Sequence, residues 1–160
     1  MSSDFAFSDN AGLCAFCEIV AGRSRASIVH QDELTMTFLD KRQYHPGHVL
    51  VIPRRHVSDM RVIDNALACA VAIALARAAR AVDRAFPVDG LSIWHSIGAG
   101  ADQEVPHLHY HVHPRCTGDG VLRVYPSAPA LPDRATLDQW AEQLRRVDQA
   151  HTGSGYVQGE

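Results

Sequence analysis

The chain has 160 residues, of which 46% are hydrophobic and 21% are charged, and its formal net charge is -3. This length fits one domain with its own core, and no basic stripe favours a nucleic-acid partner. The polar first residues carry no apolar run, so we expect neither a signal peptide nor a membrane span. Four cysteines in such a chain favour a reducing compartment, and we expect a cytoplasmic protein.

Short strands are expected in the first third of the chain. Residues 1–12 are interpreted as a flexible leader. Residues 27–31 and 34–39 are typical of two short strands joined by a turn. After the turn at Pro46-Gly47, residues 48–52 form an apolar run that suits a buried strand.

A long helix is expected to follow. It begins near Asp64, a residue type that caps helix N-termini, and stops at Phe86-Pro87. Cys69 lies within this helix and is expected to be a buried apolar residue. The apolar positions recur at helical spacing: Leu67, Val71, Leu75, Ala78 and Val82.

The second half predicts two more strands and a terminal helix. Residues 90–97 and 104–115 are expected to be strands, with a surface loop from 114 to 132. Pro132 suits the first turn of a helix, whose apolar stripe is Leu137, Trp140, Leu144 and Val147. Together these elements predict an α+β domain over residues 13–150, with an antiparallel sheet of about five strands, followed by a disordered tail over 151–160.

Histidine is the unusual residue of this sequence: there are ten, and four of them alternate from His107 to His113. Alternate residues of a strand share a face about 6.5–7 Å apart, so His107, His109, His111 and His113 are expected on one side. Leu108, Tyr110 and Val112 would then enter a core. Three interpretations are open: surface histidines without a task, a metal site, or nucleophilic catalysis by a neutral imidazole.

The segment from Gln103 to Arg115 resembles the signature of the histidine triad (HIT) family, His-x-His-x-His followed by mostly apolar residues. The segment Cys14 to Gly22 resembles the opening of the family's bacterial, zinc-containing, Hint-like branch. Residues 38–40 and 46–56 match two further blocks in the family's order and spacing. The resemblance therefore extends from about Cys14 to Arg115 and implies the HIT-like fold.

The resemblance implies a catalytic role for three histidines. His109 would attack the α-phosphorus of a nucleotide and form a nucleotidyl-histidine intermediate. His111 would contact the phosphate, and His48 would complete the histidine pocket. The implied activity is a nucleotide hydrolase or nucleotidyl-transferase, which cleaves a phosphoanhydride or phosphoramidate bond of a purine nucleotide without a metal in the chemistry.

The resemblance also implies a substrate site. Asp40 would bind the ribose hydroxyls, and Gln103 would contact the phosphate or the leaving group. Ser96 stands where many members place an amide that faces the phosphate, and Ile19 and Phe38 would line the base pocket.

A structural zinc site and a homodimer are further implications of the resemblance. Two thiolates need two more ligands for tetrahedral zinc. The implied ligands are Cys14, Cys17, His56 and His107. The implied two-fold dimer would use the helix over residues 64–86 and the strand from Gly90.

Three residues depart from the family pattern. Asp102 stands where glycine is common, Glu104 where some members use a hydroxyl that serves the leaving group, and His113 where an apolar residue is usual. Asp102 and Glu104 would repel additional phosphate charge if they faced the pocket. Two other functions stay open: a metal-dependent hydrolase that uses the histidines as ligands, and a nucleotide-binding sensor with weak turnover.

Overall fold

The computed structural model describes residues 14–121 and 129–152, which belong to two units divided after Val121. The first unit holds the sheet, and the second holds helix α3 (Arg134–Thr152). The predicted leader over residues 1–12 lies outside the described residues. Helix α3 extends into the first two residues of the predicted tail, and the rest of that tail also lies outside them. One domain over residues 13–150 stays a prediction.

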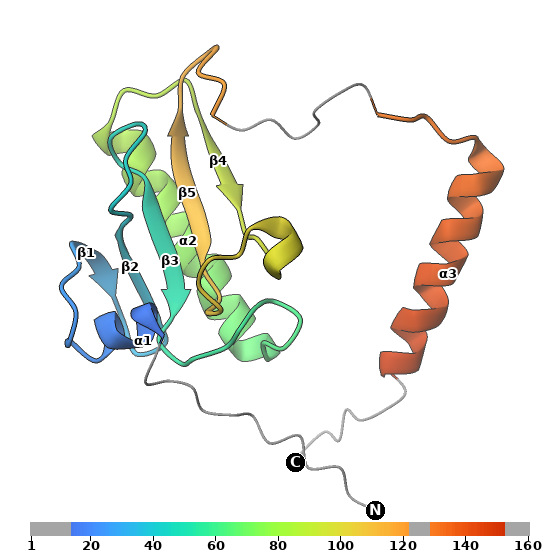
Figure 1. Cartoon of the computed structure of the whole chain (residues 1–160), viewed down its shortest axis with the longest axis horizontal. Coiled ribbons are helices and arrows are strands. Elements are labelled where there is room, and N and C mark those ends of the chain that lie inside the picture. Colours follow the sequence, from blue (N-terminus) through green and yellow to red (C-terminus); the bar gives the residue numbers. More distant parts are fainter. Residues whose placement is uncertain (1–13, 122–128, 153–160) are drawn as a thin grey trace, which may run out of the picture. The chain divides into compact units, whose positions relative to one another are not determined.

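An antiparallel sheet with strand order β1-β2-β3-β5-β4 is the frame of the first unit (Figure 1). The expected α+β fold with a five-stranded antiparallel sheet is thus confirmed. The strands are β1 (Ile28–Gln31), β2 (Thr35–Leu39), β3 (Val49–Pro53), β4 (Gly90–Trp94) and β5 (Tyr110–Arg115).

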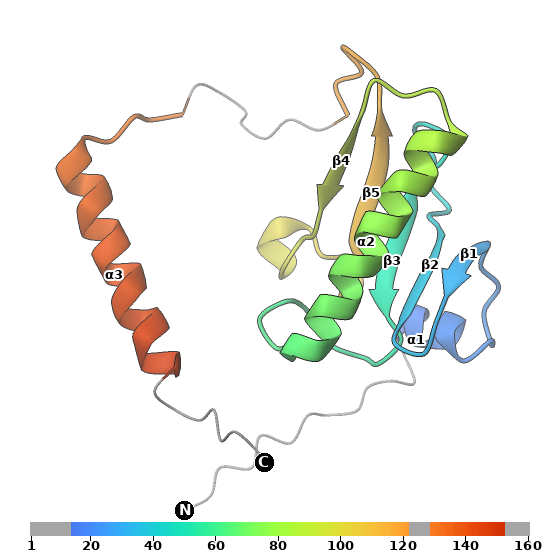
Figure 2. The ribbon, with the colours of Figure 1, turned by 180° about the vertical axis from the view of Figure 1, so that it is seen from behind.

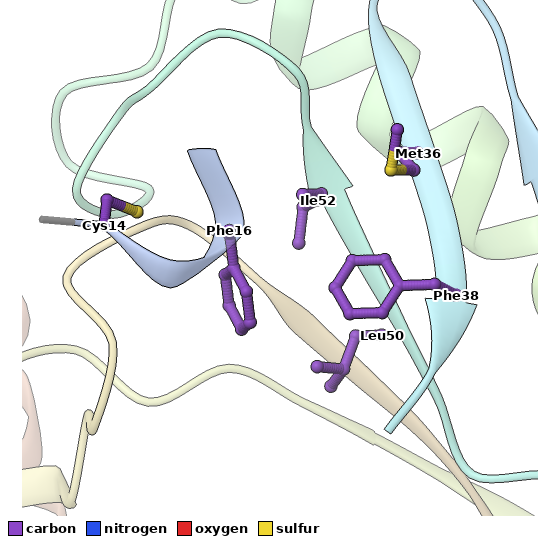
Figure 3. Close-up of a cluster of buried hydrophobic side chains, with 6 residues drawn as sticks. All are labelled: Cys14, Phe16, Met36, Phe38, Leu50 and Ile52. Atoms are coloured by element: carbon purple, nitrogen blue, oxygen red, sulfur yellow. The ribbon is translucent and has the colours of Figure 1, made fainter. Parts of the chain in front are cut away.

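Helix α2 (Asn65–Ala85) covers one face of the sheet, as Figure 2 shows. Strand β3 explains how the two faces differ: Val49 and Val51 pack toward α2, whereas Leu50 and Ile52 pack toward a short helix, α1 (Ala15–Val20). The cluster on the α1 face joins Cys14, Phe16, Met36, Phe38, Leu50 and Ile52 (Figure 3). Alternation along a strand therefore separates the face that α2 covers from the face that carries the histidines.

Helix α2 forms where its sequence pattern predicts. Asp64 caps it by accepting a hydrogen bond from the backbone N–H of Leu67 at 2.9 Å. The buried stripe is Leu67, Val71, Ala74, Ala78 and Val82. With a mean hydropathy of 1.5, α2 is long and apolar enough to cross a membrane by length and composition alone. Packing of its stripe on the sheet accounts for that composition equally well.

Two expectations were wrong. Cys69 is exposed, because it lies off the buried stripe of α2. The histidine strand begins at Tyr110 and not at Glu104. Pro106 has no N–H for a strand ladder, and the N–H of Leu108 instead donates to the carbonyl of Val57 at 2.7 Å. Residues 104–109 therefore form a loop that leads into β5.

Helix α3 is amphipathic, as predicted. Its expected apolar positions, Leu137, Trp140, Leu144 and Val147, are exposed within the described residues. Glu142 pairs with Arg145 and Arg146 at 2.9 and 3.0 Å along the helix. Such exposed pairs at three- and four-residue spacing stabilise a helix only slightly, because solvent screens them.

Candidate functional site

Three of the four alternating histidines gather beside His48, which follows the Pro46-Gly47 turn. The His109 and His111 rings are 5.2 Å apart, and His48 lies 5.1 Å from His111 and 4.6 Å from His113. Gly47 makes this turn possible. Its φ of 102° disfavours a side chain, and a Cβ there would lie 2.6 Å from the Phe86 ring.

A backbone carbonyl sets the tautomer of His109. Its Nδ1 lies 2.6 Å from the carbonyl oxygen of His107, which can only accept a hydrogen bond. Nδ1 therefore carries the proton, and Nε2 keeps its lone pair. An imidazole in this state is a nucleophile that needs no prior deprotonation.

The same argument assigns the ring protons of His48 and His111. His48 Nδ1 donates to the carbonyl oxygen of Arg42 at 3.1 Å, so its Nε2 accepts. That Nε2 lies 2.9 Å from His111 Nδ1, which must be the donor. Trp94 then stacks on His111, with ring centroids 4.5 Å apart and planes 6° from parallel.

Burial lowers the pKa of His48, His111 and His113 and so favours their neutral forms. It lowers the pKa of His111 to about 4, with the charges of His109 and His48 acting in the same direction and Asp40 opposing them. Burial also lowers the pKa of His48, against the hydrogen bond to the Arg42 carbonyl. The pKa of His113 is lowered mainly by burial as well.

A pocket of about 630 Å³ opens between α1 and the β2–β3 part of the sheet. It brings together the predicted residues Ile19, Phe38 and Asp40. Phe16 also lines it and makes an edge contact with His109 at 5.2 Å, so the pocket adjoins the histidines. Its volume is typical of small-molecule sites, and its lining combines an apolar wall with several charged side chains.

The other two predicted substrate residues lie in the segment between β4 and β5. The Gln103 amide accepts from the N–H of Gly98 and donates to the carbonyl of Ser58, each at 2.8 Å. In this structure Gln103 therefore braces two loops. Ser96 is half-buried and follows His95, whose ring lies 6.0 Å from that of His109.

The four predicted metal ligands form one cluster: Cys14, Cys17, His56 and His107 each place a ligand atom within 4.8 Å of the others. His107 Nδ1 lies 3.4 and 3.6 Å from the two sulfurs, and His56 Nδ1 lies 3.3 Å from Cys17. Tetrahedral zinc, with Zn–S about 2.3 Å and Zn–N about 2.0 Å, places S and N ligands about 3.5 Å apart. The donor set and its spacing thus fit zinc.

The second ring nitrogen of His107, Nε2, forms a hydrogen bond that favours metal binding through Nδ1. Nε2 donates to the carbonyl of Pro53 at 2.9 Å, which leaves Nδ1 free of a proton and facing the sulfurs. A carbonyl partner of this kind commonly orients a metal-binding histidine. Because the His107 carbonyl also accepts from His109, the cysteine–histidine cluster is linked directly to the His109 ring.

A second group of potential metal ligands consists of Asp40, His48 and His111. Two of its nitrogens are hydrogen-bonded to one another, and His48 Nδ1 is engaged by Arg42. A metal here would have to displace the proton shared by His48 and His111.

Besides Phe16, three contributors to the histidine site were not predicted from the sequence. Trp94 gave no signal beyond an apolar strand position, although it stacks on His111. His95 Nδ1 donates to the carbonyl of His109 at 2.8 Å and so holds its backbone. Arg42 holds His48 through its main chain, which no side-chain pattern encodes.

The sheet, the pocket and the histidine cluster define a protein of the histidine triad class. The HIT domain profile matches residues 21–118, and the chain belongs to the HIT family. It is 38% identical to Protein hit of Bacillus subtilis over 113 residues, which are 70% of this chain and 78% of that protein.

Solved structures agree. A HIT family member from B. subtilis has a TM-score of 0.78 at 32% identity, over 84% of this chain and 96% of that one. A zinc-bound histidine triad family protein from Mycobacterium smegmatis has a TM-score of 0.64 at 33% identity, over 88% and 99%.

Proposed function

We propose that the protein is a nucleotide hydrolase or nucleotidyl-transferase with His109 as the nucleophile. The observation that carries this proposal is the hydrogen bond from His109 Nδ1 to the His107 carbonyl, which leaves the Nε2 lone pair available. A purine base would lie between Ile19, Phe38 and Phe16, with the ribose hydroxyls at Asp40. Membership of the HIT family supports the same chemistry.

The reaction has two steps. His109 Nε2 attacks the α-phosphorus, a P–N bond forms, and the bond to the leaving group breaks with its electron pair going to that group. An amine leaving group also takes up a proton, which an imidazolium beside the phosphate can supply and which the water of the second step returns. Water then attacks the phosphorus and releases the nucleoside monophosphate and His109; another acceptor in place of water makes the reaction a transfer. An incoming phosphate raises the pKa of His111, because its negative charge favours the imidazolium, which can then donate to a phosphate oxygen.

Replacement of His109 tests the proposal. We expect His109→Asn to lower turnover of an adenosine phosphoramidate by several orders of magnitude, because no nucleophile replaces it. Nucleotide should still bind, and mass spectrometry of quenched wild-type reactions should find the nucleotidyl adduct on His109. Near-normal turnover by the variant would exclude this mechanism. Wild-type binding without turnover would instead indicate a sensor.

A metal-dependent hydrolase is the second candidate, because Asp40, His48 and His111 lie close enough to share an ion. Treatment with a chelator distinguishes the metal-dependent mechanism from the nucleophilic one. A nucleophilic histidine needs no metal, so brief treatment with a chelator should leave the turnover rate unchanged. A catalytic ion would be lost together with activity and restored by adding it back.

The proposal includes further expectations about a metal site, the oligomeric state and the cellular location. Zinc would be bound by Cys14, Cys17, His56 and His107, with a structural role because all four positions are filled by protein. A two-fold homodimer would form through α2 and β4. The cytoplasmic location, and the absence of nucleic-acid and membrane partners, stay predictions.

A further inference from the structure

An ion pair joins two loops at the wall of the pocket. Arg42, in the loop after β2, donates from Nη1 to Glu104 Oε1 at 2.9 Å, and Glu104 lies in the loop before β5. Both side chains line the pocket, yet they stay 62% and 64% exposed. Exposed pairs of this kind are weak because solvent screens them, so another anion can displace Glu104 at little cost.

The backbone of Arg42 is fixed more firmly than its side chain. Its N–H donates to Asp40 Oδ1 at 2.8 Å, and its carbonyl accepts from His48 Nδ1 at 3.1 Å. The residue is thus anchored between the expected ribose site and the histidines. The guanidinium also lies 3.8 Å from Asp40 Oδ1 through Nε, and its long flexible stem allows it to exchange Glu104 for another anion.

The charges around the pocket favour an anion. Its lining includes three cations, Arg25, Lys41 and Arg42, against two carboxylates, Asp40 and Glu104. The Arg42 charge also contributes to the lowered pKa of His48 and His111. The guanidinium therefore lies close enough to the histidines to interact with them electrostatically. In the proposed reaction the negative charge of the leaving group develops beside these histidines.

We propose that Arg42 exchanges Glu104 for an anionic leaving group, and so selects nucleotide phosphoanhydrides over substrates whose leaving group is neutral. The inference rests on the proposed function of His109. A phosphate leaves with the electron pair of the broken P–O bond, and the guanidinium fork can hold two of its oxygens at once. Glu104 is then the counter-ion of the empty site. Its charge was expected to repel phosphate, but in the structure Arg42 compensates it.

Two substrates test the exchange: adenosine 5′-phosphoramidate, with a neutral leaving group, and diadenosine triphosphate, with an anionic one. The readout is the ratio of kcat/KM for the anhydride to that for the phosphoramidate. Arg42→Met should lower this ratio about tenfold or more, the worth of one charge-assisted hydrogen bond. Glu104→Gln should raise it. Arg23→Met is the matched control, since it removes an Arg–Glu pair of similar arginine exposure outside the pocket lining and should keep the wild-type ratio.

An equal loss of both kcat/KM values in Arg42→Met would overturn the proposal, because it would show that the side chain only positions Asp40 and His48. So would recovery of the wild-type ratio in the charge-swapped Arg42→Glu, Glu104→Arg double variant. Calorimetric binding of inorganic tripolyphosphate makes the test independent of turnover: it should weaken about tenfold in Arg42→Met. Failure of the His109 mechanism would appear separately, as a wild-type protein that processes neither substrate and forms no adduct.

Discussion

Single backbone carbonyls decide the protonation of the histidine site. The carbonyls of His107, Arg42 and Pro53 accept from His109, His48 and His107 respectively. Each leaves the opposite ring nitrogen as an acceptor, which in His48 faces His111 and in His107 faces the sulfurs of Cys14 and Cys17. Side-chain identity in the sequence indicates the chemistry, but these main-chain partners, which lie up to 54 residues away, require the fold.

The neutral state of His111 predicts a pH dependence of stability. Its pKa is lowered to about 4 in the folded protein, against about 6.5 in an unfolded chain. Between these values the unfolded state binds the extra proton, so the free energy of unfolding should fall as pH drops from about 6.5 to about 4. The loss attributable to His111 is at most about 3 kcal/mol.

Urea unfolding of the wild type and His111→Asn at several pH values measures this effect. The variant should show a shallower decline over that pH range, because it lacks the titrating group. Equal slopes for the two proteins would show that His111 does not carry the dependence.

At the scale of helices and strands, hydrophobic periodicity was sufficient to predict those elements whose packing is local. The stripe of α2 and its Asp64 cap, and the short apolar segments of the strands, located the helix and the first four strands to within a few residues. The start of β5 was misplaced because residues 104–109 alternate like a strand, while Leu108 pairs with Val57 in another loop. Helix α1 was not predicted, because its six residues are too few to show hydrophobic periodicity. A helix of that length depends on tertiary contacts for its stability.

The metal cluster should stabilise α1 more than it assists chemistry. We expect Cys14→Ser, Cys17→Ser to lose the bound zinc and to unfold at a temperature lower by roughly 10 °C, because the ligands tie α1 to the loops carrying His56 and His107. Turnover at low temperature should fall much less than in His109→Asn.

Elemental analysis and thermal scanning measure both effects. Cys69→Ser is the matched control, since Cys69 is an exposed cysteine outside the cluster, and it should keep both the metal and the melting temperature. A full zinc complement in the double variant would refute the ligand assignment.

At the scale of the whole molecule, the first unit leaves two neighbouring surfaces that suit a second copy. Ile73 is 63% exposed on the outer side of α2, among small residues such as Ala72 and Ala76. Strand β4 is an edge of the sheet, with Ile93 48% exposed. Small residues allow close helix contact, and an edge strand can extend its ladder across a two-fold axis.

Replacement of Ile73 tests this dimer. Light scattering at micromolar concentration should give the wild type about twice the 17.5 kDa mass of one chain, and Ile73→Glu should give the monomer mass, because the interface would bring together and desolvate two carboxylates, one from each copy. Val29→Glu places the same charge on β1, the opposite edge of the sheet, at a side chain that is also 52% exposed, and should leave the dimer intact. A wild-type monomer would refute the dimer altogether. A dimer that survives Ile73→Glu but separates in Val29→Glu would move the interface to the other edge.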